Sequence, residues 1–198
     1  MNLEEYKRVR VFGYMDYCDY LKDKYGMVRS CYMTRNGGSI AKKSRTSDGL
    51  VVHHIMECKE ILLCKKEVAL TCPYEWQEPQ NLVYCDYLEH LLLHIKIVEY
   101  YAPYKGAVGY GGTDFIIGEL NDVYSGYKTN QKWREALHNK VINDKDAYLA
   151  ILKDYKILLI MTNREIYSDF RKSFNSIYGL WDYENNEALY REIEQLTL

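Results

Sequence analysis

The clearest sign of chemistry in this chain is the clustering of its histidines. Four of the five lie between positions 53 and 94 of the 198 residues. His90 and His94 stand four positions apart in a segment with helical spacing of apolar residues, so both imidazoles are expected on one helix face. Two imidazoles at this spacing are a common pair of ligands for one metal ion.

The other two clustered histidines, His53 and His54, are adjacent in the β-branched run of residues 50–55, which is typical of a short strand. Successive side chains of a strand point to opposite faces, so the two rings are expected on opposite sides. Three arrangements follow from this position. One ring faces a metal and the other faces substrate, one ring is simply buried, or a twist at the strand end brings both rings into one cleft.

Two further elements must position these side chains. Residues 82–85 (LVYC) form a second strand candidate, and residues 86 to about 101 have the spacing of a helix. Asp86 is suited to accept hydrogen bonds from the amides of the first helical turn, and Glu89 is suited to reach back to the amide of Asp86. We therefore predict a capping box at the start of this helix.

Around this core the chain is predicted to be mostly helical. An N-terminal helix over residues 2–25 ends before Gly26, and an exposed loop follows at 35–49. The predicted fold class is α+β, mostly α. The C-terminal half contains five helical segments, at residues 115–124, 131–141, 144–160, 164–178 and 184–196.

Two features of the C-terminal half receive no chemical role. The glycine-rich stretch 106–112 lacks the preceding strand and the Lys-Ser/Thr pair of a P-loop, so we interpret it as a flexible loop. His138, near the end of a helical segment, is expected to be a surface residue stabilised by the helix dipole.

Composition and cysteine usage are typical of a cytoplasmic globular protein. Hydrophobic residues make up 47% and charged residues 27%, which excludes disordered and collagen-like classes. No apolar run approaches the roughly 20 residues of a membrane span, and the first residues lack the apolar core of a secretory signal, so no membrane partner is expected. The six cysteines include no Cys-x-x-Cys pair, which argues against a zinc ribbon.

A basic stretch precedes the first strand candidate. The net charge of the chain is -2, but five basic residues and no acidic residue lie between positions 29 and 47. Lys42, Lys43 and Arg45 are the candidate nucleic-acid phosphate contacts in this stretch. A solvated loop with no binding role is the alternative.

The histidines also occur in a distinctive order with an asparagine. The segment DGLVVHHI is followed by PQNLVYCDYLEHLLLH, in which Asn81 stands nine residues before His90. This order resembles the HNH endonucleases, or ββα-metal nucleases, and most closely their colicin-type variant. The resemblance covers residues 48–97, about a quarter of the chain. It implies a small ββα-metal core between an N-terminal helix and a C-terminal helical region, with an HNH-like nuclease domain at 1–105 and the helical region at 106–198.

The resemblance implies a role for each residue. His53, His90 and His94 would hold one divalent metal ion against the scissile phosphate. His54 would be the general base, and Asn81 would orient it by pinning the loop or by hydrogen-bonding the ring. An imidazole-rich shell favours zinc, manganese or nickel over magnesium. The implied activity is metal-dependent endonucleolytic hydrolysis of nucleic-acid phosphodiester bonds, with DNA favoured over RNA.

The alternative function is a catalytically silent module that keeps the ββα-metal fold and binds nucleic acid or a protein partner. A third possibility is a helical scaffold with buried histidines.

A zincin metalloprotease is excluded because its His-Glu-x-x-His motif places the glutamate after the first histidine, whereas Glu89 precedes His90. Glu57 and Glu89 are nearby carboxylates that could enter the metal shell, but surface positions are expected for both. The C-terminal helices are candidates for homo-oligomerisation, for clamping DNA or for binding a protein partner.

Overall fold

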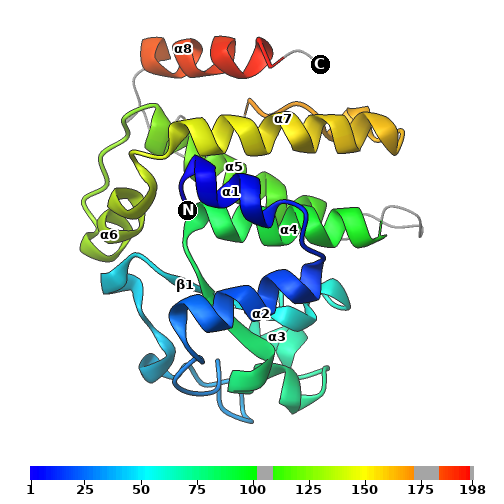
Figure 1. Ribbon diagram of the computed structural model, residues 1–198. Coiled ribbons are helices and arrows are strands. Elements are labelled where there is room, and N and C mark those ends of the chain that lie inside the picture. Colours follow the sequence, from blue (N-terminus) through cyan, green and yellow to red (C-terminus); the bar gives the residue numbers. More distant parts are fainter. Residues whose placement is uncertain (102–108, 172–182, 197–198) are drawn as a thin grey trace.

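The computed structural model describes residues 1–101, 109–171 and 183–196, and its fold is α+β and mostly α (Figure 1). This confirms the predicted fold class. None of the helices in the described ranges is long and apolar enough to cross a membrane. The elements in these ranges are the strands β1 Val51–His54 and β2 Leu82–Cys85, and the helices α1 Leu3–Val9, α2 Tyr14–Tyr25, α3 Lys66–Ala69, α4 Tyr87–Tyr101, α5 Tyr110–Tyr124, α6 Lys132–Val141, α7 Lys145–Met161 and α8 Tyr183–Glu194.

The region around the clustered histidines consists of two paired strands and the helix that follows them. β1 and β2 are antiparallel, with Val51 opposite Cys85 and His54 opposite Leu82. β2 has the predicted bounds and is buried along its whole length, and α4 begins after a single residue, Asp86. α4 contacts both strands, so the order strand, strand, helix forms a ββα unit.

The start of α4 is held by the predicted capping box. The amide of Glu89 donates to Oδ1 of Asp86, and the amide of Asp86 donates to Oε2 of Glu89, both at 2.8 Å. Both carboxylates are buried, so the surface position expected for Glu89 is wrong. Lys24 of α2 compensates the charge with Nζ 2.6 Å from Glu89, and the amino group of Met1 contacts Asp86. Burial, together with repulsion from Asp86, still raises the pKa of Glu89 to about 7.

The N-terminal segment is two helices rather than the single helix predicted. Residues 10–13 separate α1 from α2, and Gly13 there is in an extended conformation. The break leaves backbone carbonyls without helical partners. The buried Nζ of Lys96, from α4, donates to the carbonyls of Arg10 (3.1 Å) and Phe12. A cation from a distant part of the chain therefore stabilises a bend that local spacing does not indicate.

The C-terminal helices share one hydrophobic core with the ββα unit. α5 packs along α4, and α7 packs against α1 and α4, so core residues from both sides of position 105 are continuous (Figure 1). Asn121 of α5 joins two further segments to this core. Its amide donates to the carbonyl of Phe170 (2.8 Å) and its oxygen accepts from the hydroxyl of Tyr148 (2.6 Å).

Two helices in this half differ from the prediction by more than two residues. α5 begins at Tyr110, five residues before the predicted start. Of the helix predicted over 164–178, the described part contains only the short 3-10 helix Glu165–Tyr167, and residues 172–178 lie outside the described ranges. The early start of α5 places the end of the glycine-rich stretch inside a helix, against α4.

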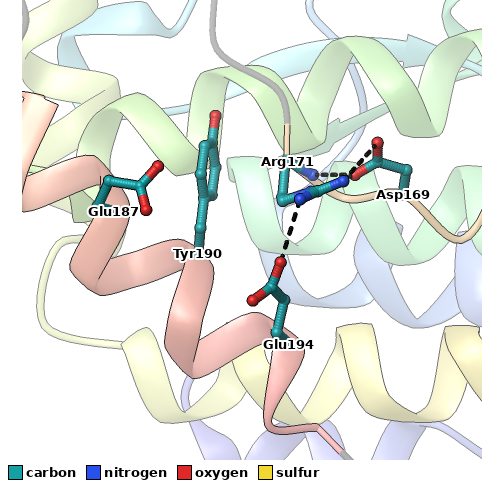
Figure 2. Close-up of a pocket in the computed structure, with 5 residues that line it drawn as sticks. All are labelled: Asp169, Arg171, Glu187, Tyr190 and Glu194. Carbon is teal, nitrogen blue, oxygen red and sulfur yellow. Dashed lines mark hydrogen bonds and ion pairs between the residues drawn. The ribbon is translucent and has the colours of Figure 1, made fainter.

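Arg171 attaches α8 to a segment that comes before it in the chain (Figure 2). Its guanidinium lies 3.0 Å from Asp169 and 3.1 Å from Glu194 of α8, and these groups line a polar pocket with Glu187 and Tyr190. The three charged side chains are more than half exposed, so water weakens their ion pairs. We therefore interpret these ion pairs as contacts that attach α8, and the pocket that they line as having no functional role.

We expect Lys24→Met to lower the free energy of unfolding at pH 7 by about 2 kcal/mol, because the capping carboxylates lose their side-chain cation. The loss should be smaller at pH 5. The pKa of Glu89 is higher in the folded than in the unfolded protein, so folding takes up a proton as the pH falls and the uncompensated charge disappears. Urea unfolding at both pH values measures the two effects.

The matched control is Lys22→Met on the same helix, because Lys22 pairs with Asp19, whose side chain is 70% exposed. This control should cost less than about 0.5 kcal/mol. Equal losses for the two variants would contradict the compensating role of Lys24.

Candidate metal centre

Three histidines from β1 and α4 meet at one point. His53 of β1, with His90 and His94 on one face of α4, places one ligand nitrogen of each ring within 4.8 Å of the others. The structure thus brings together the three residues that the resemblance implies as metal ligands. This cluster could hold a metal ion. The fifth histidine, His138 of α6, is buried beside Glu119 (3.9 Å) rather than exposed as predicted.

The hydrogen bonds around His53 set its tautomer. The hydroxyl of Tyr14 donates to the carbonyl of Ile55 (2.8 Å), so it can only accept from Nε2 of His53, 2.9 Å away. Nε2 therefore carries the proton and Nδ1 keeps its lone pair. Nδ1 is buried and has no hydrogen-bond partner among the described residues. Metal-binding histidines usually donate their other N–H to a fixed acceptor, and Tyr14 supplies that acceptor here.

Burial keeps all three rings neutral. It lowers the pKa of His94 to about 4, and it holds the pKa values of His53 and His90 well below the usual range, with the neighbouring histidines adding to the effect. Metal ions bind the unprotonated imidazole. Because the three rings are already neutral, a metal ion does not have to displace a proton from them at neutral pH. Three neutral imidazoles around one point form a donor set that could hold a metal ion.

α5 covers the centre through its first glycines. A Cβ at Gly112 would lie 2.2 Å from Nδ1 and 2.3 Å from Cε1 of His94, so a glycine is needed for α5 to approach this closely. Gly109 has a φ of +92°, and a Cβ there would lie 2.8 Å from Val98. The prediction of a flexible loop is therefore wrong for the part of this stretch that the structure describes, and residues 106–108 lie outside that part.

Glu57, one of the two carboxylates that the sequence placed near the metal shell, lies beside two of the rings. Oε2 of Glu57 is 3.6 Å from Nδ1 of His53 and 3.5 Å from Nε2 of His94. The Glu57 side chain is only 13% exposed, so the predicted surface position is wrong, and burial raises its pKa to about 7. The strand predicted to include Ile55 ends at His54. The 3-10 helix Ile55–Cys58 follows at once and carries Glu57 back over β1.

His54 contacts a different set of residues from His53, as expected for opposite faces of a strand. Its Nε2 lies 3.1 Å from Oε1 of Gln77, and its ring centroid lies 4.4 Å from that of Tyr32. The amide nitrogen of Gln77 donates to the carbonyl of Leu63 (3.1 Å), so the Gln77 oxygen is the acceptor and Nε2 of His54 carries the proton. Burial lowers the pKa of His54 to about 4.

Asn81 makes its hydrogen bond within the loop and not to the His54 ring. Its side-chain nitrogen donates to the carbonyl of Glu75 (2.8 Å). This bond spans the turn that contains Gln77, so Asn81 helps to hold the residue that binds His54. Gln77 was missed because a glutamine at the end of a short 3-10 helix carries no recognisable pattern.

The three basic candidates differ in their surroundings. Lys42 is exposed. Lys43 is partly buried, with Nζ 4.4 Å from the ring centroid of Tyr32, the ring that packs against His54. Arg45 donates to Asp48 (2.7 Å) and to a backbone carbonyl (2.9 Å), so its guanidinium is engaged within the fold.

Comparison of the chain with protein-family models, curated protein sequences and solved structures finds no match in any of the three. The function is therefore argued from the geometry and chemistry of the histidine centre.

We expect the zinc affinity to fall by no more than about tenfold per pH unit between pH 7 and pH 5. The three histidines are already unprotonated in this range, and Glu57 is the one neighbouring group that gains a proton. Three histidines with ordinary pKa values would each take up a proton, and the affinity would fall up to roughly a thousandfold per pH unit. Zinc titration against a competing chelator at three pH values measures the slope, and a slope of more than one proton would contradict the neutral burial of the rings.

We expect Gly112→Ala to cost about 1–3 kcal/mol of stability and to weaken zinc binding, because the methyl group must push against the His94 ring. Gly111→Ala is the matched control, since a Cβ at Gly111 meets nothing within 4 Å. That control should raise stability by up to about 1 kcal/mol through helix propensity. Urea unfolding and zinc titration of both variants provide the test, and the packing of α5 on His94 would be contradicted by equal behaviour.

Proposed function

We propose that this chain is a metal-dependent endonuclease with a ββα-metal core. It would hydrolyse phosphodiester bonds of nucleic acid, with DNA preferred over RNA. The observation that carries the proposal is the meeting of His53, His90 and His94 within a ββα unit. These are the positions that the resemblance to HNH nucleases assigns to the metal ligands. The adjacent His54 supports the proposal as a candidate base.

The three histidines would hold one divalent ion, which when bound supplies Lewis-acid stabilisation of the charge on the phosphate and the leaving oxygen. The protein prepares the donors for this role. Tyr14 fixes the tautomer of His53, and burial keeps all three rings unprotonated. Imidazole donors favour zinc, manganese or nickel over magnesium.

His54 is suited to the role of general base by its tautomer. Because Nε2 donates to Gln77, Nδ1 holds the lone pair that would take a proton from water. Among the described residues no hydrogen bond to Nδ1 of His54 is found. Burial lowers the pKa of His54 to about 4, so the ring is unprotonated at neutral pH but is a weaker base than an ordinary imidazole while it stays covered. Gln77 and Asn81 are positioning residues in this proposal, since they act through the orientation of His54.

Phosphate contacts are proposed for the basic residues that precede β1. Lys43 stands over Tyr32, which packs against His54, and its Nζ also donates to the carbonyl of Ile40 (3.0 Å). Lys42 is exposed and adds positive charge beside it. Arg45 is proposed chiefly as a brace of this region, because its donors bind Asp48 and the backbone.

A catalytically silent nucleic-acid-binding module is the second candidate function. It is favoured by the burial of His54, which is only 1% exposed. A general base must reach water, so cleavage requires the cover around the His54 ring, including Tyr32, to open when nucleic acid binds.

We expect the chelator-treated protein to cut supercoiled plasmid once a single metal is added back, and His54→Ala to lose this activity by a factor of about 100 or more. The variant should still bind zinc, because His54 is not one of the triad. Mixed RNA in parallel reactions tests the preference for DNA. The matched control is Gln80→Ala, an exposed residue near the same loop, which should cut like the unmodified chain.

The outcomes separate the two candidates. Metal-dependent cutting that His54→Ala loses supports the nuclease and its base. Metal-dependent retention of nucleic acid in a gel without cutting supports the binding module. If neither cutting nor retention occurs with any of zinc, manganese, nickel and magnesium, both candidates are wrong.

A further inference from the structure

Glu57 stands beside the histidine triad at distances that neither a hydrogen bond nor an ion pair explains. Its Oε2 lies 3.6 Å from Nδ1 of His53 and 3.5 Å from Nε2 of His94. These distances are too long for side-chain hydrogen bonds. The rings are neutral, so no opposite charge is present to attract the carboxylate from their side.

The distances to His53 and His94 are those of two ligands on one ion. Glu57 lies outside the group of ligand atoms within 4.8 Å of one another that the three histidines form, so its carboxylate would have to move closer to the triad when the ion binds. With bonds of about 2.1 Å, ligand atoms at the corners of a tetrahedron stand roughly 3.4 Å apart. Nδ1 of His53 is buried, lacks a hydrogen-bond partner in the described part of the chain, and holds its lone pair because Tyr14 accepts from Nε2. We propose that Oε2 of Glu57 is the fourth ligand of the metal, completing a shell of three histidines and one carboxylate. This inference deepens the proposed function and rests on its metal site.

The environment of Glu57 gives it no other role. Its side chain is 13% exposed, and none of the described residues donates a hydrogen bond to its carboxylate. Burying a carboxylate without a partner is costly unless it is paired or coordinates a metal. A metal bound by the triad supplies the missing positive charge.

One hydroxyl group, that of Tyr14, helps to fix the positions of both His53 and Glu57. Tyr14 accepts from Nε2 of His53 and donates to the carbonyl of Ile55, the first residue of the 3-10 helix that carries Glu57. The orientation of the ligand ring and the start of the turn are therefore fixed together. Such shared support is typical of the groups that orient metal ligands.

A fourth protein ligand has a consequence for function. Shells of four protein ligands are typical of structural zinc, whereas catalytic zinc keeps one position open. In a nuclease built on this centre, a phosphate would either displace Glu57 or join the shell as a fifth ligand. A donor set of three imidazoles and one carboxylate also favours zinc over magnesium.

The test is metal binding by Glu57→Gln, with Glu60→Gln as the matched control in the same segment, because Glu60 is exposed. Zinc alone is titrated into the full chain against a chromophoric chelator, and cobalt(II) alone is used as a spectroscopic probe of coordination. We expect Glu57→Gln to bind zinc at least about tenfold more weakly and to change the visible cobalt bands. Glu60→Gln should match the unmodified chain in both measurements.

Thermal unfolding separates loss of a ligand from loss of folding. In chelator, Glu57→Gln should be at least as stable as the unmodified chain, because a buried charge without a partner is removed. In zinc, the order should reverse. Unchanged zinc affinity and cobalt bands would overturn the proposal, and so would a variant that is less stable in chelator.

These measurements do not depend on nuclease activity. A protein that never cuts nucleic acid but loses zinc affinity in Glu57→Gln has the proposed four-ligand site and lacks the proposed function. A protein that cuts, with Glu57→Gln binding zinc normally, has the function and a three-histidine site.

Discussion

The fold and the candidate centre both depend on the two carboxylates that begin α4. Asp86 and Glu89 exchange hydrogen bonds with each other's amides, which fixes the residue at which the helix starts. A helix that started one residue later would turn His90 and His94 by about 100° away from His53, since 3.6 residues make one turn. Because both carboxylates are buried, they need the cation of Lys24 from α2. Helix start, ligand direction and the docking of α2 are thus parts of one arrangement.

The centre is built from polar groups that burial alone would disfavour. His53 and His94 are buried, His90 and Glu57 are partly buried, and the described residues leave Nδ1 of His53 without a hydrogen-bond partner. Packing enforces this arrangement from two sides. Tyr14 orients His53 from α2, and Gly112 lets α5 lie against the ring of His94. Bound metal would turn a costly cluster into a stabilising one, because the ion binds the folded state and not the unfolded chain.

β1 divides the chemistry between its two faces. On one face His53 joins His90 and His94 in the triad. On the other face His54 contacts Tyr32 and Gln77, and the basic residue Lys43 also lies there. The proposed metal function and the proposed base function therefore come from adjacent residues with different surroundings. The hydrogen bonds of each ring place its proton on Nε2 and leave the lone pair on Nδ1, although different partners are responsible. This shared tautomer is the strongest chemical link between the two proposed roles.

The sequence by itself determined what depends on local spacing and on residue type. The capping box and the common face of His90 and His94 belong to this class, because they join residues at most four positions apart. The bounds of β2 follow from its residue types, whereas its pairing with β1 joins residues far apart in the chain. Only the tertiary structure decided the rest. Gln77 beside His54, Lys96 in the break between α1 and α2, and Gly112 against His94 all join segments far apart in the chain, where local spacing carries no information. Glu57 is close in sequence to His53, yet its place depends on a 3-10 turn that Tyr14 holds from another helix, and local spacing did not indicate that turn.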